Sequence, residues 1–162
     1  PNQVLIALAL FLTFFIMAPT FTNIYELVAI PYMNGEIQTP DALDKASKEI
    51  KSFMVTNTRE TDLSMFAEIS GAQQFYSKEE IPFSIALPAF ITSELKTAFQ
   101  IGFLLFLPFL VIDMVVASVL MSLGMMMLSP MLIALPFKIL LFVLVDGWSM
   151  TVGSLVSTYV TQ

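Results

Sequence analysis

The stretch that decides the fold is residues 101–162, which reads IGFLLFLPFLVIDMVVASVLMSLGMMMLSPMLIALPFKILLFVLVDGWSMTVGSLVSTYVTQ. It runs for 62 residues and contains three charged side chains: Asp113, Lys138 and Asp146. An apolar run this long with so few charges is typical of helices that cross a membrane or lie buried in an assembly. The stretch therefore predicts membrane-type helices rather than part of a soluble globule.

Three consecutive methionines mark a turn in the middle of this stretch. Met125, Met126 and Met127 stand between Gly124 and Pro130, two residue types that commonly interrupt helices. A turn at a protein surface is normally polar, whereas methionine side chains are flexible and adapt to varied neighbours. The pattern favours a soft constriction in a pore over simple filling of a hydrophobic core.

Asp113 and Lys138 lie at equal distances from that turn. Their midpoint falls between Met125 and Met126, so a chain that folds back there holds both charges about 19 Å from the turn. Each charge alone would be costly in an apolar layer, so we expect the two to pair, either within one hairpin or between neighbouring subunits. The alternative is that Lys138 extends to the membrane surface and Asp113 lies at an interface.

Asp113 and Asp146 allow another interpretation, an aspartyl protease in which two carboxylates share a proton. Asp146 is twenty residues past the midpoint of the turn and Asp113 is twelve before it, so their depths would differ by about 12 Å. Lys138 would also favour the ionised form of Asp113. We therefore interpret Asp146-Gly147-Trp148 as a helix irregularity near an interface, with the tryptophan at a boundary between polar and apolar surroundings.

Residues 1–33 form a second apolar segment, interrupted by Pro19. The segment predicts either one long helix kinked at that proline or a bent pair of helices. Pro31 and the turn signal Asn34-Gly35 mark its expected end. The chain starts at Pro1 without an initiator methionine, which favours a fragment of a longer precursor.

The polar part of the chain is residues 34–96, which carry ten acidic and six basic side chains. Thr39-Pro40-Asp41 is a helix start and predicts an amphipathic helix to about Val55. A second helix is expected from near Thr58 to Gly71. Its predicted buried residues are Leu63, Phe66 and Ile69. Neither helix has an apolar face wide enough for an independent core, so both are expected to pack on the rest of the assembly.

Two further helices are expected to complete the chain. One begins at Pro88 and is kinked at Pro108, and the other runs from about Met131 toward the C-terminus. Pro136 and Gly147 are expected to make this last helix irregular.

Composition excludes several classes of function. The chain is 57% hydrophobic, has a formal net charge of −6, and contains neither cysteine nor histidine. The composition therefore excludes disulfide bonds, zinc sites built from cysteine or histidine, and histidine-based acid–base catalysis. There is no nucleotide-binding loop, and an acidic balance argues against a nucleic-acid partner. We expect neither an enzyme nor a cofactor or metal site.

Several blocks of sequence resemble a known family. They are NQVLI at 2–6, FLTFF at 11–15, TSELKTAFQIGF at 92–103, GMMM at 124–127, ALPFK at 134–138 and LFVLVDGW at 141–148. With these blocks the chain resembles, over nearly its whole length, the FliP family of flagellar export-gate subunits, which is shared with virulence type III secretion systems. The signal peptide and first apolar segment of that family are expected to lie upstream of Pro1.

The resemblance implies an assembly as well as a fold. It implies a pentamer that joins FliQ, FliR and other export-apparatus membrane proteins in a conical channel. That channel lies in the bacterial inner membrane and at its periplasmic face, within the flagellar basal body, and unfolded protein substrates pass through it. Met125, Met126 and Met127 would form a gasket in the channel, and Asp113 and Lys138 an ion pair between subunits.

These observations together predict an all-α fold of long, kinked helical hairpins that assemble into an oligomeric ring or helical channel. Its parts are an apolar segment at 1–33, a polar extracytoplasmic segment at 34–96 and an apolar hairpin at 97–162. The predicted function is that of a subunit of the flagellar type III protein export gate. The alternative is a generic ion- or solute-coupled channel or transporter subunit, with Asp113 and Lys138 as its coupling pair.

Overall fold

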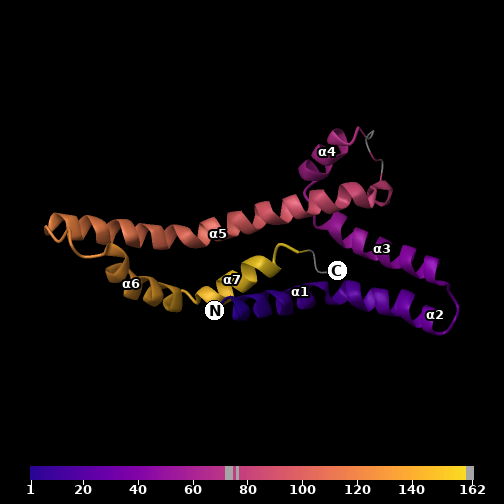
Figure 1. The fold of residues 1–162 in the computed structure, drawn as a ribbon, viewed down its shortest axis with the longest axis horizontal. Helices are drawn as coiled ribbons and strands as arrows, with labels where there is room; N and C mark the ends of the chain where they lie inside the picture. The colour runs from indigo at the N-terminus through magenta and orange to yellow at the C-terminus, as the bar shows by residue number, and fades with distance from the viewer. Residues whose placement is uncertain (72–74, 76, 160–162) are drawn as a thin grey trace. The chain divides into compact units, whose positions relative to one another are not determined.

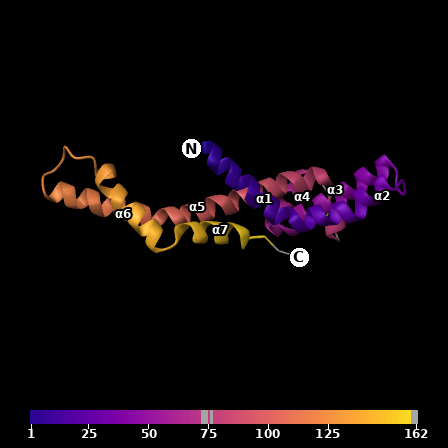
Figure 2. The same cartoon turned by 90° about the horizontal axis from the view of Figure 1, so that it is seen from below.

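The computed structural model describes residues 1–71, 75 and 77–159 (Figures 1 and 2). Every regular element in these residues is helical, which confirms the predicted all-α fold. The chain divides into two compact units. The first comprises Pro1–Leu95 together with the residues from Thr158 on, and the second is Lys96–Ser157.

The first apolar segment is one long helical run. Helix α1 (Asn2–Ile24) continues through a π-helical segment (Tyr25–Ala29) into α2 (Ile30–Met33). Pro19 lies inside α1 without ending it, so the long helix is correct and the bent pair is not. The run ends as predicted, because Gly35 adopts φ +76° and the Glu36 N–H donates to the Pro31 carbonyl.

The polar segment contains the two helices that the sequence predicts. Helix α3 (Thr39–Thr56) starts with Pro40 in its first turn, and α4 (Glu60–Ile69) ends before Gly71, which adopts φ +70°. On α3, Lys48 Nζ lies 2.6 Å from Asp44 Oδ2. The predicted burial of Ile69 is wrong, since its side chain is 73% exposed. As the last residue of α4 it lies beyond the part of the helix that packs on the core.

The core of the first unit forms where α3 meets the start of the next long helix. Its buried residues are Met54, Val55, Ile81, Ile85 and Ala86. Half-buried side chains pack around them: Phe53, Leu63, Phe66, Phe75 and Phe90. Helix α1 lies alongside α3 in the same unit (Figure 1). Both polar-segment helices therefore contribute to a core that they share with other parts of the chain.

Helix α5 (Phe83–Ser122) is 40 residues long and begins five residues before the predicted start at Pro88. The Pro82 carbonyl accepts hydrogen bonds from the N–H groups of Ile85 and Ala86, which fixes the first turn. Pro88 and Pro108 both lie within the helix. The predicted start at Pro88 is wrong because proline is tolerated inside an apolar helix when its neighbours satisfy the freed backbone groups. The kink at Pro108 stays a prediction.

The second unit is a hairpin whose second arm is broken. The last part of α5 leads through residues 123–129 into α6 (Pro130–Leu144), followed by α7 (Gly147–Val156). The axes of α6 and α7 differ by 62°, so the single last helix that the sequence predicts is two helices. By length and composition, the helical run from Asn2 to Met33 and α5 are each able to cross a membrane, and α6 with α7 could form a third, broken span.

Candidate functional site

The methionine loop, residues 123–129, begins with a defined helix end. Gly124 adopts φ +71°, its N–H donates to the Met121 carbonyl, and the Met125 N–H donates to the Leu120 carbonyl 2.9 Å away. This is the Schellman arrangement, in which a left-handed residue satisfies the last carbonyls of a helix. The predicted turn is thus confirmed, and its position is set by Gly124 because a side chain at positive φ would be strained.

The three methionines of this loop project from the hairpin. Their side chains are increasingly exposed along the loop, from 46% at Met125 to 80% at Met126 and 99% at Met127. Ser129 then takes an extended conformation and Pro130 starts α6. The loop therefore presents unpaired thioether groups at the tip of the hairpin rather than filling its interior.

The structure brings Asp113 and Lys138 together. Lys138 Nζ on α6 lies 2.6 Å from Asp113 Oδ1 on α5. The lysine side chain is 23% exposed and the aspartate 34%, so the pair is largely shielded even in a single chain. Both charges belong to the same chain here. Their role between neighbouring subunits, which the family resemblance implies, remains a prediction.

The hairpin arms also enclose an apolar groove near the ion pair. It has a volume of about 460 Å³ and lies between α5 and α6. Its lining residues are Val111, Ile112, Val115, Val116, Val119, Leu120, Ile133 and Phe137. Side chains of this kind supply packing rather than chemistry, and two of them, Ile112 and Phe137, are the chain neighbours of Asp113 and Lys138.

Asp146 has a structural role at the start of α7. It adopts φ +52° and ψ +58°, and its Oδ1 accepts a hydrogen bond of 3.5 Å from the Ser149 N–H. Asp113 in turn is paired with Lys138. Each carboxylate therefore has its own partner, and the structure gives no support to a proton-sharing pair of aspartates.

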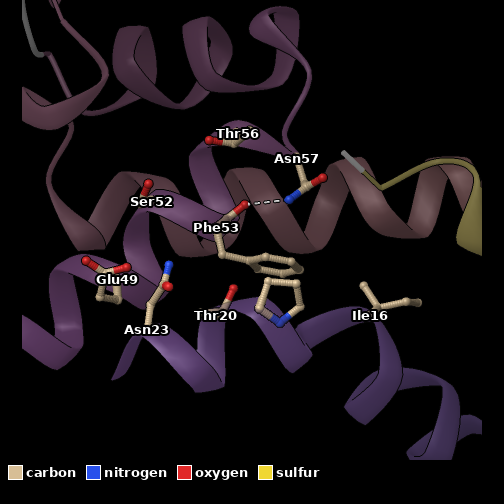
Figure 3. Close-up of a pocket in the computed structure, with 9 residues that line it drawn as sticks. Ile16, Thr20, Asn23, Glu49, Ser52, Phe53, Thr56 and Asn57 are labelled. Carbon is tan, nitrogen blue, oxygen red and sulfur yellow. Dashed lines mark hydrogen bonds between the residues drawn. The ribbon is translucent and has the colours of Figure 1, made fainter. Parts of the chain in front are cut away.

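A polar pocket in the first unit was not predicted from the sequence (Figure 3). It lies between α1 and α3 and has a volume of about 250 Å³. Its lining includes Thr20, Asn23, Glu49, Ser52 and Asn57, and the side-chain amide of Asn57 donates to the Phe53 carbonyl over 2.9 Å. These residues are scattered over two helices, so no local motif could have revealed them.

The C-terminal end of the described chain is fixed to the first unit through Tyr159. Its ring stacks on Phe53 with centroids 6.1 Å apart, and its hydroxyl donates to Glu94 Oε2. Burial raises the pKa of the Tyr159 hydroxyl well above its ordinary value, and the adjacent Glu94 carboxylate raises it further. The hydroxyl is therefore a stable proton donor at neutral pH.

Comparison with known proteins gives one consistent result. A model of the FliP family matches residues 1–155. The flagellar biosynthetic protein FliP of Cereibacter sphaeroides is 63% identical over 159 residues, which cover 98% of this chain and 53% of that protein. The protein of the same name from Bacillus subtilis (strain 168) is 58% identical over 159 residues, covering 98% of this chain and 72% of that one.

A third relative gives the same result. The flagellar biosynthetic protein FliP of Buchnera aphidicola subsp. Acyrthosiphon pisum (strain APS) is 53% identical over 161 residues, which are 99% of this chain and 42% of that protein. The chain thus spans about half the length of the Cereibacter relative and less than half that of the Buchnera relative.

Proposed function

This chain belongs to the FliP family, and from that premise we propose that it is a membrane subunit of the flagellar type III protein export gate. In this role it forms part of the channel through which unfolded export substrates pass. The observation that carries the proposal is the family match over residues 1–155. The match includes the hairpin with its methionine loop and ion pair.

The apolar helices support a membrane location. Most of their large hydrophobic side chains are exposed in the single chain, including Phe11, Phe15, Phe99 and Phe103. Exposed aromatic and aliphatic surface of this extent requires lipid or neighbouring subunits to cover it. We assign the chain to the inner membrane and its periplasmic face, in an assembly with FliQ, FliR and further copies of itself.

The methionine loop is proposed to act as a gasket. Met126 and Met127 are the most exposed side chains of the loop, and thioethers pack against one another without needing hydrogen bonds. Loops from several subunits around one axis would exclude water and ions when closed. They would also rearrange readily around a passing polypeptide of any sequence.

The ion pair is proposed to hold the hairpin arms together and to contribute to contacts between subunits. Asp113 and Lys138 lie on neighbouring helices, in a stretch of sequence that is otherwise almost uncharged. Charges in such surroundings are stable only when paired. We propose a structural, non-catalytic role for both residues.

A chimera tests the export role. The matching 159 residues of the Bacillus subtilis relative are replaced by those of this chain, which are 58% identical, in a strain that lacks the native protein. We expect restored swimming motility and secretion of flagellar proteins into the medium. A chimera that is present in the membrane, is incorporated into the export complex and still fails to secrete would contradict the proposal.

A second candidate function is that of an ion- or solute-coupled channel subunit, which the Asp113–Lys138 pair favours. The two functions differ in the size of what passes. A gate for polypeptides predicts that a folded, slowly unfolding passenger fused to an export substrate stalls in the complex and blocks it. An ion or solute channel predicts that such a passenger leaves conductance unchanged and never enters the complex.

A further inference from the structure

The two arms of the hairpin are held in a fixed register by two contacts. Asp113 pairs with Lys138, and the ring of Phe109 lies 6.4 Å from that of Phe142 between centroids. The two pairs share one register, because Phe109 precedes Asp113 by four residues and Phe142 follows Lys138 by four. The contacts are therefore two rungs of one antiparallel ladder, one helical turn apart, and its midpoint lies between Met125 and Met126.

Phe142 also meets residues at the break between α6 and α7. A Cβ atom added to Gly147 would lie 2.3 Å from two ring carbons of Phe142, far inside van der Waals contact. Trp148 meets the same ring edge-on, with centroids 5.6 Å apart and planes at 84°. The ring of Phe142 thus contacts α5, Gly147 and Trp148 at once, which fixes its position.

Asp146 makes this break possible. It is the one non-glycine residue with positive φ in the part of the chain that the structure describes. Aspartate tolerates this conformation better than most residues, although the conformation persists only where the surroundings support it. Here the Asp146 carboxylate caps α7 by accepting from the Ser149 N–H, so the same residue turns the chain and starts the next helix.

We propose that Asp146, Gly147 and Trp148 form an elbow that sets the register of the α5–α6 hairpin by clamping Phe142. The elbow positions the Asp113–Lys138 rung one turn away, and through it the residues that flank the methionine loop. An apolar helix pair has few directional contacts of its own, so a shift along the helix axis is opposed mainly by such fixed points. The hairpin geometry supports this role whether or not the chain serves in protein export.

Disulfide formation between engineered cysteines measures the register directly. The same register predicts that Ala117 lies opposite Ala134, one helical turn closer to the methionine loop, and the native chain has no cysteine to interfere. The pair Ala117→Cys and Ala134→Cys is introduced into the membrane-assembled protein, which is then oxidised, and free thiols are counted by maleimide tagging. We expect rapid formation of the disulfide. Failure of the parent pair to react would overturn the assigned register.

Glycine substitutions then test the elbow. In the cysteine-pair background, Gly147→Ala should lower the rate of disulfide formation by about fivefold or more, because the added methyl group overpacks against the clamped ring. The matched control is Gly153→Ala on α7, where an added Cβ meets nothing within 4 Å and the rate should stay at the parent value. Equal effects of the two substitutions would exclude a clamp at Gly147.

A compensating substitution separates the clash from a general loss of folding. Phe142→Leu removes the ring that the new methyl group meets, so Gly147→Ala combined with Phe142→Leu should react faster than Gly147→Ala alone. If the single variant accumulates too poorly for its rate to be measured, a higher protein level in the double variant shows instead that the clash with the Phe142 ring is relieved. A double variant no better than the single one would contradict the proposal.

Asp146 provides an independent test. Asp146→Asn keeps both the hydrogen-bond acceptor and the tolerance for positive φ, and should react like the parent. Asp146→Ala loses both and should react more slowly. If Asp146→Asn were as impaired as Asp146→Ala, the negative charge rather than the elbow would be the property that matters, and the proposal would be wrong.

Discussion

At the scale of single residues, the contact between Asp113 and Lys138 combines short distance with apolar surroundings. The 2.6 Å separation of Nζ and Oδ1 allows a charge-assisted hydrogen bond, and the partial shielding of both side chains keeps solvent from weakening it. Because each charge stabilises the other, loss of one partner harms the protein more than loss of both.

The first prediction concerns this pair. We expect Asp113→Ala or Lys138→Ala to reduce the amount of assembled complex, because the remaining charge stays in an apolar environment. The cost should lie between the ~1 kcal/mol of an exposed pair and the ~3–5 kcal/mol of a buried one. Native gel electrophoresis of membrane extracts measures the amount of assembled complex. The exchange Asp113→Lys with Lys138→Asp should recover part of the loss, and normal assembly of both single variants would show that the pair is not structural.

The second prediction concerns the exposed thioethers. Replacing Met125, Met126 and Met127 together by alanine should leave assembly intact but make the resting channel leak small solutes, since dispersion contacts across a closed ring would be lost. Uptake of a small fluorescent dye or a swelling assay measures the leak. The matched control replaces Met114, Met121 and Met131 by alanine, which removes the same chemistry outside the loop. Unchanged permeability with the complex present would leave the loop without a sealing role.

At the scale of secondary-structure elements, the C-terminal tail is attached to helices far from it in sequence. Tyr159 stacks on Phe53 of α3 and donates to Glu94 of α5. Glu94 lies just before the residues that form the second unit, and Tyr159 lies just after them. Their contact therefore links the two points of the first unit between which the second unit is inserted in the sequence.

The third prediction is a pH dependence of this contact. Because the folded-state pKa of Tyr159 is raised, its contribution to stability is present throughout the neutral range, up to the ordinary tyrosine pKa of about 10. It is lost as the pH rises further, through the folded-state pKa. A spectrophotometric titration of the detergent-solubilised protein should show a tyrosine component that ionises well above the ordinary tyrosine pKa. Tyr159→Phe should remove that late component, and its persistence would assign the shift to another tyrosine.

Some of these elements could be predicted from the sequence and others could not. The turn at Gly124 and the pairing of Asp113 with Lys138 followed from spacing alone, because an antiparallel hairpin places equidistant residues opposite each other. An irregularity at Asp146-Gly147-Trp148 was predicted as well, whereas the early start of α5 and the contacts of Phe142 were not. The start of α5 depends on backbone hydrogen bonds to the Pro82 carbonyl, and Phe142 meets Phe109 of α5 through a tertiary contact without a local signal.

At the scale of the whole molecule, the core of the first unit is shared among segments that are distant in sequence. Met54 and Val55 of α3 pack with Ile81, Ile85 and Ala86, and the π-helical segment after α1 also contacts α3. The polar residues 34–96 therefore contain much of this core. However, the π-helical segment and Tyr159, which lie outside that range, also pack against α3.

The fourth prediction follows from this sharing. We expect an isolated fragment of residues 34–96 to lack a stable fold, because it loses the packing of α1 and the Tyr159 ring against α3. Limited proteolysis and thermal denaturation followed by circular dichroism provide the measurement. Resistance to protease together with cooperative unfolding would show that this segment is an autonomous domain.

The length of α5 has a consequence for how the protein matures. Forty helical residues extend about 60 Å, roughly twice the thickness of the hydrocarbon layer of a bilayer. The first part of α5 carries Glu94 and Lys96 and packs in the core of the first unit through Ile85 and Ala86, so we expect this part to lie outside the hydrocarbon layer. Because one continuous helix belongs to both units, we expect insertion of its later part into the membrane to be linked to folding of the segment that precedes it.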